Sequence, residues 1–330
     1  MICLSRSEVE RLLDLDRLID AVGEAFADLS SGAASVAPRV SVTADQAGGW
    51  LGCMASAMPN HAMLAVKLVS LFPNQPSSGL PTHQAVLLIF DDRNGAPVAL
   101  LDATYITAVR TAAASAVATR MLARPDTRVL SIIGTGVQAR SHIRLVSRCR
   151  QFQEILVAGR RSEAAEAVVS ELQSEQSIPL RAVNIEEAVA RADVLCATTH
   201  SAEPVVRGTE LRPGVHVNSV GVNRSGREVD ADAIARAVLV VDSRAACLGG
   251  ADAAGANDIT WAIREGIIDQ HHIRAEIGEL VLGRMAGRAS PDDITLFKSV
   301  GVGVQDAAAA ALVLKAAAQQ HARSELDLSS

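Results

Sequence analysis

The feature that most constrains the fold is an alternation of short apolar runs and helical segments after Pro125. Strands that alternate with helices form a parallel sheet covered by helices on both faces. We therefore predict a Rossmann-type, doubly wound α/β domain over 121–300. Its strands are predicted over 128–133, 154–158, 180–183, 193–198, 215–220 and 237–242. Its helices are predicted after Gly136 and over 163–173 and 185–191.

The flanking segments, 1–120 and 301–330, predict a second, α+β domain. Apolar residues at three- and four-residue spacing predict helices over 5–14 and 16–31, a helix is expected over 106–122, and a strand over 295–300 precedes a helix over about 304–320. Asn94-Gly95 is typical of a hairpin turn. Strands are predicted over 39–43, 51–56, 62–71, 84–91 and 97–101.

Composition excludes several function classes. Of the 330 residues, 49% are apolar, enough for a core in each of two domains. With 31 basic and 37 acidic residues the net charge is −6, so the chain lacks the excess of positive charge that is typical of proteins that bind nucleic acid or anionic lipid. There is no signal-like start and no apolar stretch of about 18 residues. We expect a soluble, cytoplasmic protein that binds neither nucleic acid nor membrane.

Cysteine and histidine patterns predict no metal site. The five cysteines are odd in number and never form a Cys-x-x-Cys pair, which argues against disulfides and structural zinc. His271-His272 is an adjacent pair, whereas a helical zinc site needs histidines four residues apart.

Residues 131–139, SIIGTGVQA, match the dinucleotide fingerprint Gly-x-Gly-x-x-Ala after an apolar strand and before a helix. Gly134 permits a tight turn, Gly136 lets backbone amides approach a pyrophosphate, and Ala139 allows close packing of the helix on the sheet. The alternative is a purely structural glycine turn. In this context the motif favours a nicotinamide dinucleotide.

The second predicted strand, over 154–158, is followed by Gly159, Arg160, Arg161 and Ser162 in place of the acid that usually binds the adenosine ribose. An arginine pairs with a 2′-phosphate, which an acid would repel. The loop therefore favours NADP(H) over NAD(H). The alternative is that the arginines are only solvent-exposed loop residues. Further cofactor candidates at the carboxyl ends of later strands are Thr198, Thr199, Val220 and Gly221.

Three cations lie among apolar residues of the first domain: Arg39, Lys67 and Arg110. A lone lysine in a strand usually lies at a solvated edge. Together, however, three cations could bind an α-carboxylate, and a desolvated lysine can donate a proton because its pKa falls readily. His83 could approach the same site, although a structural histidine is the commoner case.

These motifs, taken in order, resemble the ornithine cyclodeaminase/mu-crystallin family along essentially the whole chain. The resemblance is carried by Lys67 and by the segments GLPTHQA (79–85), NGAPVALLDATYITAVRTAAASAVAT (94–119), GTGVQA (134–139), PGVHVNSVG (213–221), AEIGEL (275–280) and FKSVGVGVQD (297–306). It implies a homodimer formed through the first domain, a Rossmann-type nucleotide domain and an active site in the cleft between the domains.

The resemblance also implies roles for individual residues. Arg39, Lys67 and Arg110 match the family's carboxylate-binding and catalytic cations. The positions that match residues lining cofactor or substrate are Thr82, Arg110, Gly136, Val137, Gln138, Thr199, Ser299 and Val300.

One position separates the branches of the family. Cyclodeaminases and alanine dehydrogenases resemble one another in carrying a catalytic Asp where this chain has Asn223, and cyclodeaminases have Lys where it has Arg227. An amide can bind a substrate but has no proton to exchange near neutral pH. The chain resembles the mu-crystallin branch, which implies reduction of ketimines by NADPH.

We predict an NAD(P)H-dependent reductase of small ketimine carboxylates, of the pyrroline- or piperideine-2-carboxylate type, that yields the L-amino acid. Lys67, Arg110 and Asn223 are the catalytic candidates, Val300 a substrate contact and Arg227 a cofactor contact. The alternatives are an alanine- or opine-type dehydrogenase, with Glu228 or Asp230 replacing the missing acid, an ornithine cyclodeaminase, and a mu-crystallin-like binding protein without turnover.

Overall fold

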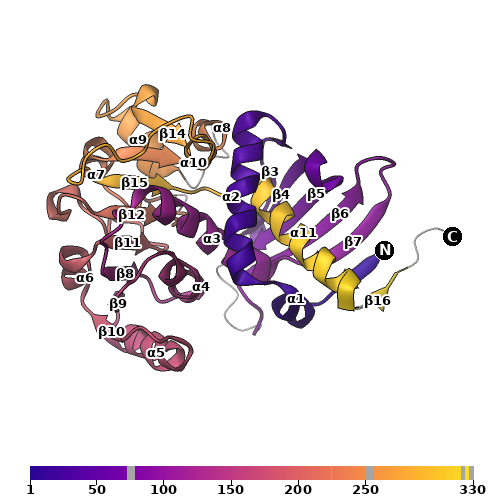
Figure 1. Ribbon diagram of the computed structural model, residues 1–330, viewed down its shortest axis with the longest axis horizontal. Helices are drawn as coiled ribbons and strands as arrows, with labels where there is room; N and C mark the ends of the chain where they lie inside the picture. The colour runs from indigo at the N-terminus through magenta and orange to yellow at the C-terminus, as the bar shows by residue number, and fades with distance from the viewer. Residues whose placement is uncertain (73–78, 224, 250–255, 321–323, 327–330) are drawn as a thin grey trace. The chain divides into compact units, whose positions relative to one another are not determined.

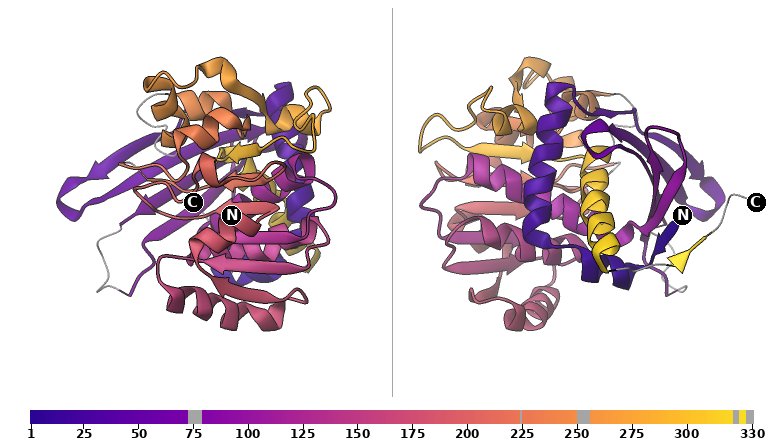
Figure 2. Two further views of the ribbon diagram at one scale, coloured as in Figure 1. Left: turned by 90° about the vertical axis from the view of Figure 1, so that its left-hand side faces the viewer. Right: turned by 45° about the vertical axis from the view of Figure 1, so that its right-hand side comes forward.

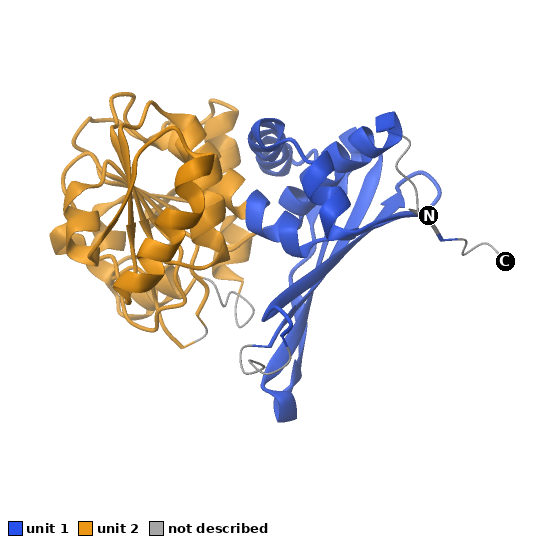
Figure 3. Ribbon diagram, turned by 90° about the horizontal axis from the view of Figure 1, so that it is seen from below, with its two compact units in different colours: residues 1–110, 302–330 blue, residues 111–301 orange. Residues whose placement is uncertain are grey.

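The structure is a computed structural model that describes residues 1–72, 79–223, 225–249, 256–320 and 324–326. Its contacts divide the chain into two compact units (Figure 3). The first unit contains Met1–Arg110 and Val302–Ser330, and the second contains Thr111–Gly301. One boundary therefore falls inside helix α3 (Thr104–Leu122).

The first unit is built on a mostly antiparallel sheet with the strand order β16-β1-β7-β6-β5-β4-β2, and β3 also pairs with β4. β6 and β7 form the predicted hairpin, which the register between them confirms. The strands are β1 (Ile2–Leu4), β2 (Ser35–Val36), β3 (Val40–Ala44), β4 (Gly49–Met58), β5 (Met63–Leu71), β6 (His83–Asp91), β7 (Pro97–Asp102) and β16 (Ser324–Glu325).

Three helices accompany this sheet: α1 (Arg6–Leu12), α2 (Leu15–Ser31) and α11 (Gly303–Gln320). α11 packs on β4 and β5 and lies beside α2 (Figures 1 and 2). The Asp14 side chain caps α2 by accepting hydrogen bonds from its first backbone N–H groups, and Gly32 ends the helix as predicted. The face of the sheet toward α11 forms the core, so alternate residues of β4, β5 and β6 are buried.

The second unit contains a parallel sheet with the strand order β10-β9-β8-β11-β12-β15-β13-β14. Its central strands are almost completely buried, as expected when helices cover both faces. This arrangement confirms the predicted Rossmann-type sheet. The strands are β8 (Val129–Ile133), β9 (Glu154–Ala158), β10 (Leu180–Val183), β11 (Val194–Ala197), β12 (His216–Ser219), β13 (Val238–Val241), β14 (Ile273–Glu276) and β15 (Thr295–Lys298).

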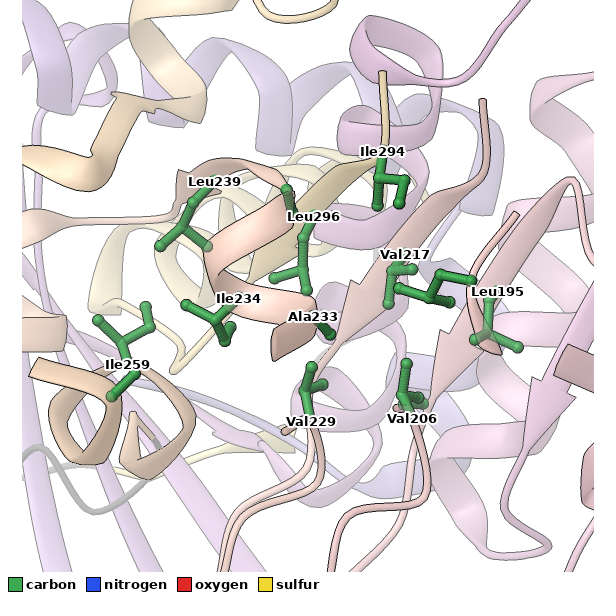
Figure 4. Packing of buried hydrophobic residues seen from close by; sticks show 14 of the residues in the cluster. Leu195, Val206, Val217, Val229, Ala233, Ile234, Leu239, Ile259, Ile294 and Leu296 are labelled. Atoms are coloured by element: carbon green, nitrogen blue, oxygen red, sulfur yellow. The ribbon is translucent and has the colours of Figure 1, made fainter. Parts of the chain in front are cut away.

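Branched aliphatic side chains fill the core between this sheet and its helices. Figure 4 shows Val217 and Leu296 of the sheet near Ile234 of α7 (Ala231–Arg236) and Val229. Besides the part of α3 that it contains, the described α-helices of the unit include α4 (Val137–Val146), α5 (Ser162–Leu172), α6 (Ile185–Arg191), α8 (Arg244–Leu248), α9 (Asn257–Arg264) and α10 (Ile277–Val281). Among the described residues, no helix is both long and apolar enough to cross a membrane.

Glu276 and Glu279 lie in the AEIGEL segment that carries part of the family resemblance. Glu276 ends strand β14 and caps α10. Arg274 is exposed between buried Ile273 and Ala275, as is usual for an edge strand. The Glu279 side chain accepts a hydrogen bond from the Glu276 backbone N–H at 2.7 Å, so this pair of acids has a capping role.

Candidate functional site

The inner face of the first unit's sheet carries a buried lysine. Lys67 lies in β5 between Met54 of β4 and Leu87 of β6, and only 1% of it is exposed. Met54 and Leu87 are also buried, so the ammonium group lies in largely apolar surroundings. A buried charge needs a charged or hydrogen-bonding partner, because transfer out of water costs several kcal/mol.

The partner of Lys67 is a carboxylate from the first turn of α11. Lys67 Nζ lies 2.9 Å from each oxygen of Asp306. Arg110 Nε donates to Asp306 Oδ1 at 3.1 Å, and Arg110 Nη1 donates to Gln305 Oε1 at 2.7 Å. Asp306 is completely buried. One carboxylate therefore holds together two cations that are far apart in the sequence.

These contacts shift the pKa values of the cluster. Burial, followed by the charge of Arg110, lowers the pKa of Lys67 to about 7, although Asp306 opposes the shift. Burial would raise the pKa of Asp306, but the charges of Arg110 and Lys67 outweigh it and hold the pKa below its ordinary value. Burial and the same two cations lower the pKa of His83 to about 4, so its imidazole is neutral. Lys67 can therefore exchange a proton near neutral pH.

Positive charge exceeds negative charge around Lys67. The charge of half-buried Arg39 also lowers the Lys67 pKa, and Asp306 is the one acid among the strongest influences on it. An anion would offset this excess, and guanidinium groups bind carboxylates through paired hydrogen bonds. Of the predicted carboxylate-binding cations, Lys67 and Arg110 thus meet at Asp306, and the charge of Arg39 acts on Lys67. Thr82, the residue before His83, is exposed, and its backbone oxygen accepts a hydrogen bond from Phe72 N at 2.8 Å.

In the second unit, the glycine-rich loop connects β8 to α4. Gly134 has φ +129°, and a Cβ there would lie 2.4 Å from Thr198 Oγ1, so both conformation and space require glycine. A Cβ at Gly136 would meet nothing within 4 Å. Gly136 precedes the first turn of α4, which contains Val137 and Gln138 and presents unpaired backbone N–H groups. This geometry fits a pyrophosphate.

The loop after β9 presents exposed cations beside this turn. Arg160, Arg161 and Ser162 are all exposed, and neither arginine has an ion-pair partner within the part of the chain that the structure describes. Gly159, the residue before them, lies close to Thr135 of the glycine-rich loop: a Cβ on it would be 2.7 Å from Thr135 Cγ2. The two loops therefore lie together, as a dinucleotide site requires.

The Glu228 side chain holds residues at the carboxyl edge of the sheet in place through hydrogen bonds. Its Oε1 accepts hydrogen bonds from Thr199 N at 2.5 Å and Thr199 Oγ1 at 2.8 Å, and its Oε2 accepts from Ser219 Oγ at 3.0 Å and Gly221 N at 2.8 Å. A Cβ at Gly221 would lie 2.5 Å from Glu228 Oε2, so only glycine fits. Val220, which precedes Gly221, is buried and donates through its backbone N–H to Ala197 O at 3.1 Å.

A second buried carboxylate holds the turn after β15. Asp242 Oδ2 accepts hydrogen bonds from Ser299 Oγ at 3.0 Å, Val300 N at 2.8 Å and Gly301 N at 2.7 Å. Ser299 N also donates to Ser219 O at 3.0 Å. Ser299 and Val300 are thus fixed at the same edge as Thr199 and Gly221.

The side chains of Asn223 and Arg227 make local contacts. Asn223 Nδ2 donates to His200 O at 3.0 Å, and its Oδ1 accepts from Ser225 N at 2.9 Å. Arg227 pairs with Glu265 at 2.9 Å and lies over the ring of Trp261. These contacts fix the side chains of Asn223 and Arg227. The catalytic role of Asn223 and the cofactor role of Arg227 stay predictions.

The sequence did not single out Asp242, Asp306 or Lys298, whose Nζ donates to Gly221 O at 2.9 Å. Each is a charged residue within or directly after an apolar segment, namely strand β13, the alanine-rich helix α11 and the buried strand β15. A charged residue in a buried segment must have a buried partner. The occurrence of charged residues in these apolar segments was therefore the signal that could have identified them. Among the described residues, no group of three or more His, Cys, Asp or Glu side chains could hold a metal ion.

Comparison with known proteins gives consistent similarities. The model of the ornithine cyclodeaminase/mu-crystallin family matches residues 1–321. The ketimine reductase mu-crystallin of Mus musculus is 37% identical over 266 residues, which cover 80% of each chain.

Two solved structures resemble the whole chain. The structure of Thermococcus litoralis Δ1-pyrroline-2-carboxylate reductase, in complex with NADH and L-proline, is 38% identical with a TM-score of 0.94, covering 99% of this chain and 100% of that one. An archaeal alanine dehydrogenase dimer with bound NAD is 32% identical with a TM-score of 0.92, covering 99% of each chain. Together with the family match, these similarities show that the chain belongs to the ornithine cyclodeaminase/mu-crystallin family.

Proposed function

We propose that the chain is an NAD(P)H-dependent reductase that converts a small ketimine carboxylate, such as pyrroline- or piperideine-2-carboxylate, into the L-amino acid. The observation that carries the proposal is buried Lys67, with its pKa near 7, bound to Asp306 beside Arg110. Family membership supports the same chemistry, since relatives include ketimine and pyrroline-2-carboxylate reductases.

Reduction of a C=N bond requires one hydride at carbon and one proton at nitrogen. A bound nicotinamide would supply the hydride. Arg39 and Arg110 would bind the substrate carboxylate and orient the imine, with Val300 as a further contact. Lys67 would donate its proton to the imine nitrogen and regain one from solvent after turnover. No further acid is needed, because the substrate arrives with its C=N bond already formed.

The remaining acids of the second unit argue against amine chemistry. A cyclodeaminase or amino-acid dehydrogenase must also exchange protons with an amine or with water, and Asn223 cannot. Both oxygens of Glu228 accept hydrogen bonds from the protein, and Asp230 Oδ1 caps α7 by accepting from Ala233 N at 2.8 Å. These hydrogen bonds support a structural role for both acids.

For the cofactor, we propose NADP(H), with NAD(H) as a weaker alternative. Arg160, Arg161 and Ser162 support this preference, because they are exposed at the end of β9, where a 2′-phosphate would lie, and occupy the place of the acid that usually binds the adenosine ribose. The Thermococcus litoralis relative was solved with NADH, so the preference for NADP(H) is tested by comparing the two cofactors directly. The other residues that we propose to contact cofactor are Thr82, Arg110, Gly134, Gly136, Val137, Gln138, Thr198, Thr199, Val220, Gly221, Arg227 and Ser299.

The decisive experiment is a screen of cyclic and linear ketimine carboxylates with NADPH and NADH. We expect oxidation of the cofactor on addition of a ketimine, without any need for ammonia, and faster with NADPH. Turnover that requires ammonia with a 2-oxo acid would instead identify an amino-acid dehydrogenase. Release of ammonia from L-ornithine would identify a cyclodeaminase, and binding without turnover would favour a ligand-binding protein.

We also propose that two copies associate through the outer face of the first unit's sheet, opposite α11. This outer face exposes Val40 and Val42 of β3, Leu51 of β4, Leu64 of β5 and Val86 of β6, each 39–66% exposed. A contiguous apolar sheet face of this kind favours association, because water is released from it. The dimeric alanine dehydrogenase among the relatives supports a second copy as the occupant.

Val86→Glu is expected to convert the dimer into a monomer, because a charge would be buried in the interface without a partner. Light scattering after gel filtration measures the change in mass, and circular dichroism checks the fold. The matched control is Met121→Glu, at an exposed apolar residue of the second unit, which should stay dimeric. A V86E variant with the same mass as the unmodified protein would contradict this interface.

The chain's cysteines agree with a reducing compartment, and we propose that the protein acts in the cytoplasm. All five cysteines are free, and Cys196 and Cys247 are buried. Burial raises the pKa of Cys196 to about 12, so its thiol is unreactive.

A further inference from the structure

The described part of the carboxyl edge of the second unit's sheet contains several buried acids and a buried lysine. Lys298 Nζ lies 2.5 Å from Asp258 Oδ2 and donates to Gly221 O at 2.9 Å. Glu228 and Asp242 are buried at the same edge, with 3% and 1% of their surfaces exposed. Among the residues that the structure describes at this edge, three buried acids, Glu228, Asp242 and Asp258, accompany the buried Lys298.

The hydrogen bonds of Glu228 favour its ionised form. Backbone N–H groups of Thr199 and Gly221 point at its two oxygens, and a backbone N–H can only donate. The Ser219 hydroxyl accepts from Lys298 Nζ at 3.1 Å, so its own hydrogen is directed to Glu228. Burial, with the charge of Asp258, raises the pKa of Glu228, whereas the charge of Lys298 and the hydrogen bonds from Thr199 stabilise the ionised form.

Strand order places Glu228 beside one half of the dinucleotide site. The order of the sheet reverses between β8 and β11, and a dinucleotide binds across such a reversal. In such a site the loops after β8 and β9 bind the pyrophosphate and the adenosine. The nicotinamide half would therefore bind at the ends of β11 and β12. Thr199 and Gly221, the two residues that Glu228 holds, follow these strands.

The ring of an oxidised nicotinamide carries one positive charge that the reduced ring lacks. A buried negative charge nearby stabilises the charged ring, and low-dielectric surroundings strengthen the effect. The two hydrogen-bonded backbone groups also keep the carboxylate fixed, so no reorganisation is needed when charge develops.

We propose that Glu228 is a positioning residue that fixes Thr199 and Gly221 in the nicotinamide half of the site, and that its buried charge favours the oxidised, cationic ring over the reduced, neutral one. This inference rests on the proposed function only for the identity of the cofactor. It concerns affinity for the two redox forms, which can be measured without an imine substrate.

The test compares the dissociation constants of NADP⁺ and NADPH for the purified protein and for Glu228→Gln, by calorimetry and by NADPH fluorescence. Loss of one nearby buried charge is expected to weaken NADP⁺ by about tenfold more than NADPH. ADP-ribose, which lacks the nicotinamide ring, should bind both proteins equally and so reports an intact adenosine half. NAD⁺ and NADH should show the same change in ratio.

Two controls separate charge from structure. Glu228→Asp keeps the charge but shortens the side chain, so both affinities should fall while their ratio stays near that of the unmodified protein. Glu175→Gln removes an exposed negative charge of the same unit and should change neither value. If Glu228→Gln does not fold, Asp242→Asn removes a charge from the same edge and should shift the ratio in the same direction by a smaller factor.

Equal weakening of NADP⁺ and NADPH in Glu228→Gln would overturn the electrostatic role and leave Glu228 as a structural residue. Failure of the unmodified protein to bind either redox form would overturn both this inference and the cofactor proposal. Normal binding and a shifted ratio without ketimine reduction would overturn only the proposed reaction.

Discussion

Lys67→Ala is expected to lower kcat/KM for ketimine reduction by about a thousandfold, because general acid catalysis by a positioned side chain contributes roughly 10² to 10⁴. The alanine has no proton to donate, and the site loses one of the cations that attract the substrate carboxylate. Nucleotide affinity should stay nearly unchanged, since the glycine-rich loop and the carboxyl edge belong to the second unit. Steady-state kinetics and NADPH titration measure the two effects separately.

The chain offers a matched control for this variant. It contains three lysines, Lys67, Lys298 and Lys315, and Lys315 is exposed on α11, the same helix that carries Asp306. Lys315→Ala should therefore leave activity unchanged. Thermal unfolding should show Lys67→Ala folded, because Asp306 keeps its ion pair with Arg110. Normal turnover in Lys67→Ala would contradict the assigned role.

Sequence patterns predicted secondary structure best where all residues of an element have the same degree of burial. In the second unit, central strands are buried on both faces, so they appear as continuous apolar runs, and the predicted strand over 154–158 coincides with β9. The edge strand β14 was missed because its alternating pattern is short and contains exposed Arg274. Sequence periodicity identifies a strand only when enough residues share one environment.

The partners of charged residues could not be predicted from local sequence patterns. Asp306 lies 239 residues from Lys67 and meets it only because α11 packs on β5. Glu228 was considered as a replacement acid, whereas the structure shows it accepting hydrogen bonds from Thr199 and Gly221. Residue type suggests which groups can do chemistry, but tertiary packing decides whether they face each other or the solvent.

Asp306→Asn is expected to move the pH dependence of ketimine reduction to lower pH. Lys67 donates only when protonated, so the rate falls as pH rises through its pKa. Asp306 raises that pKa, while burial, Arg110 and Arg39 lower it. Without the carboxylate charge, only the lowering influences remain, and Lys67 loses its proton at a lower pH. At pH 8 the rate should drop by about tenfold or more, because each unit of pKa corresponds to a factor of ten. At pH 6 the loss should be smaller.

The shape of the pH profile distinguishes this role from a structural one. A variant that is only destabilised would lose melting temperature and amplitude while the midpoint of its pH profile stayed in place. Asp92→Asn replaces an exposed acid of the same unit and should leave both midpoint and amplitude unchanged. An unshifted midpoint in Asp306→Asn, with folding intact, would mean that Lys67 is not the group whose proton limits the reaction, because its strongest negative neighbour would then have no influence on the rate.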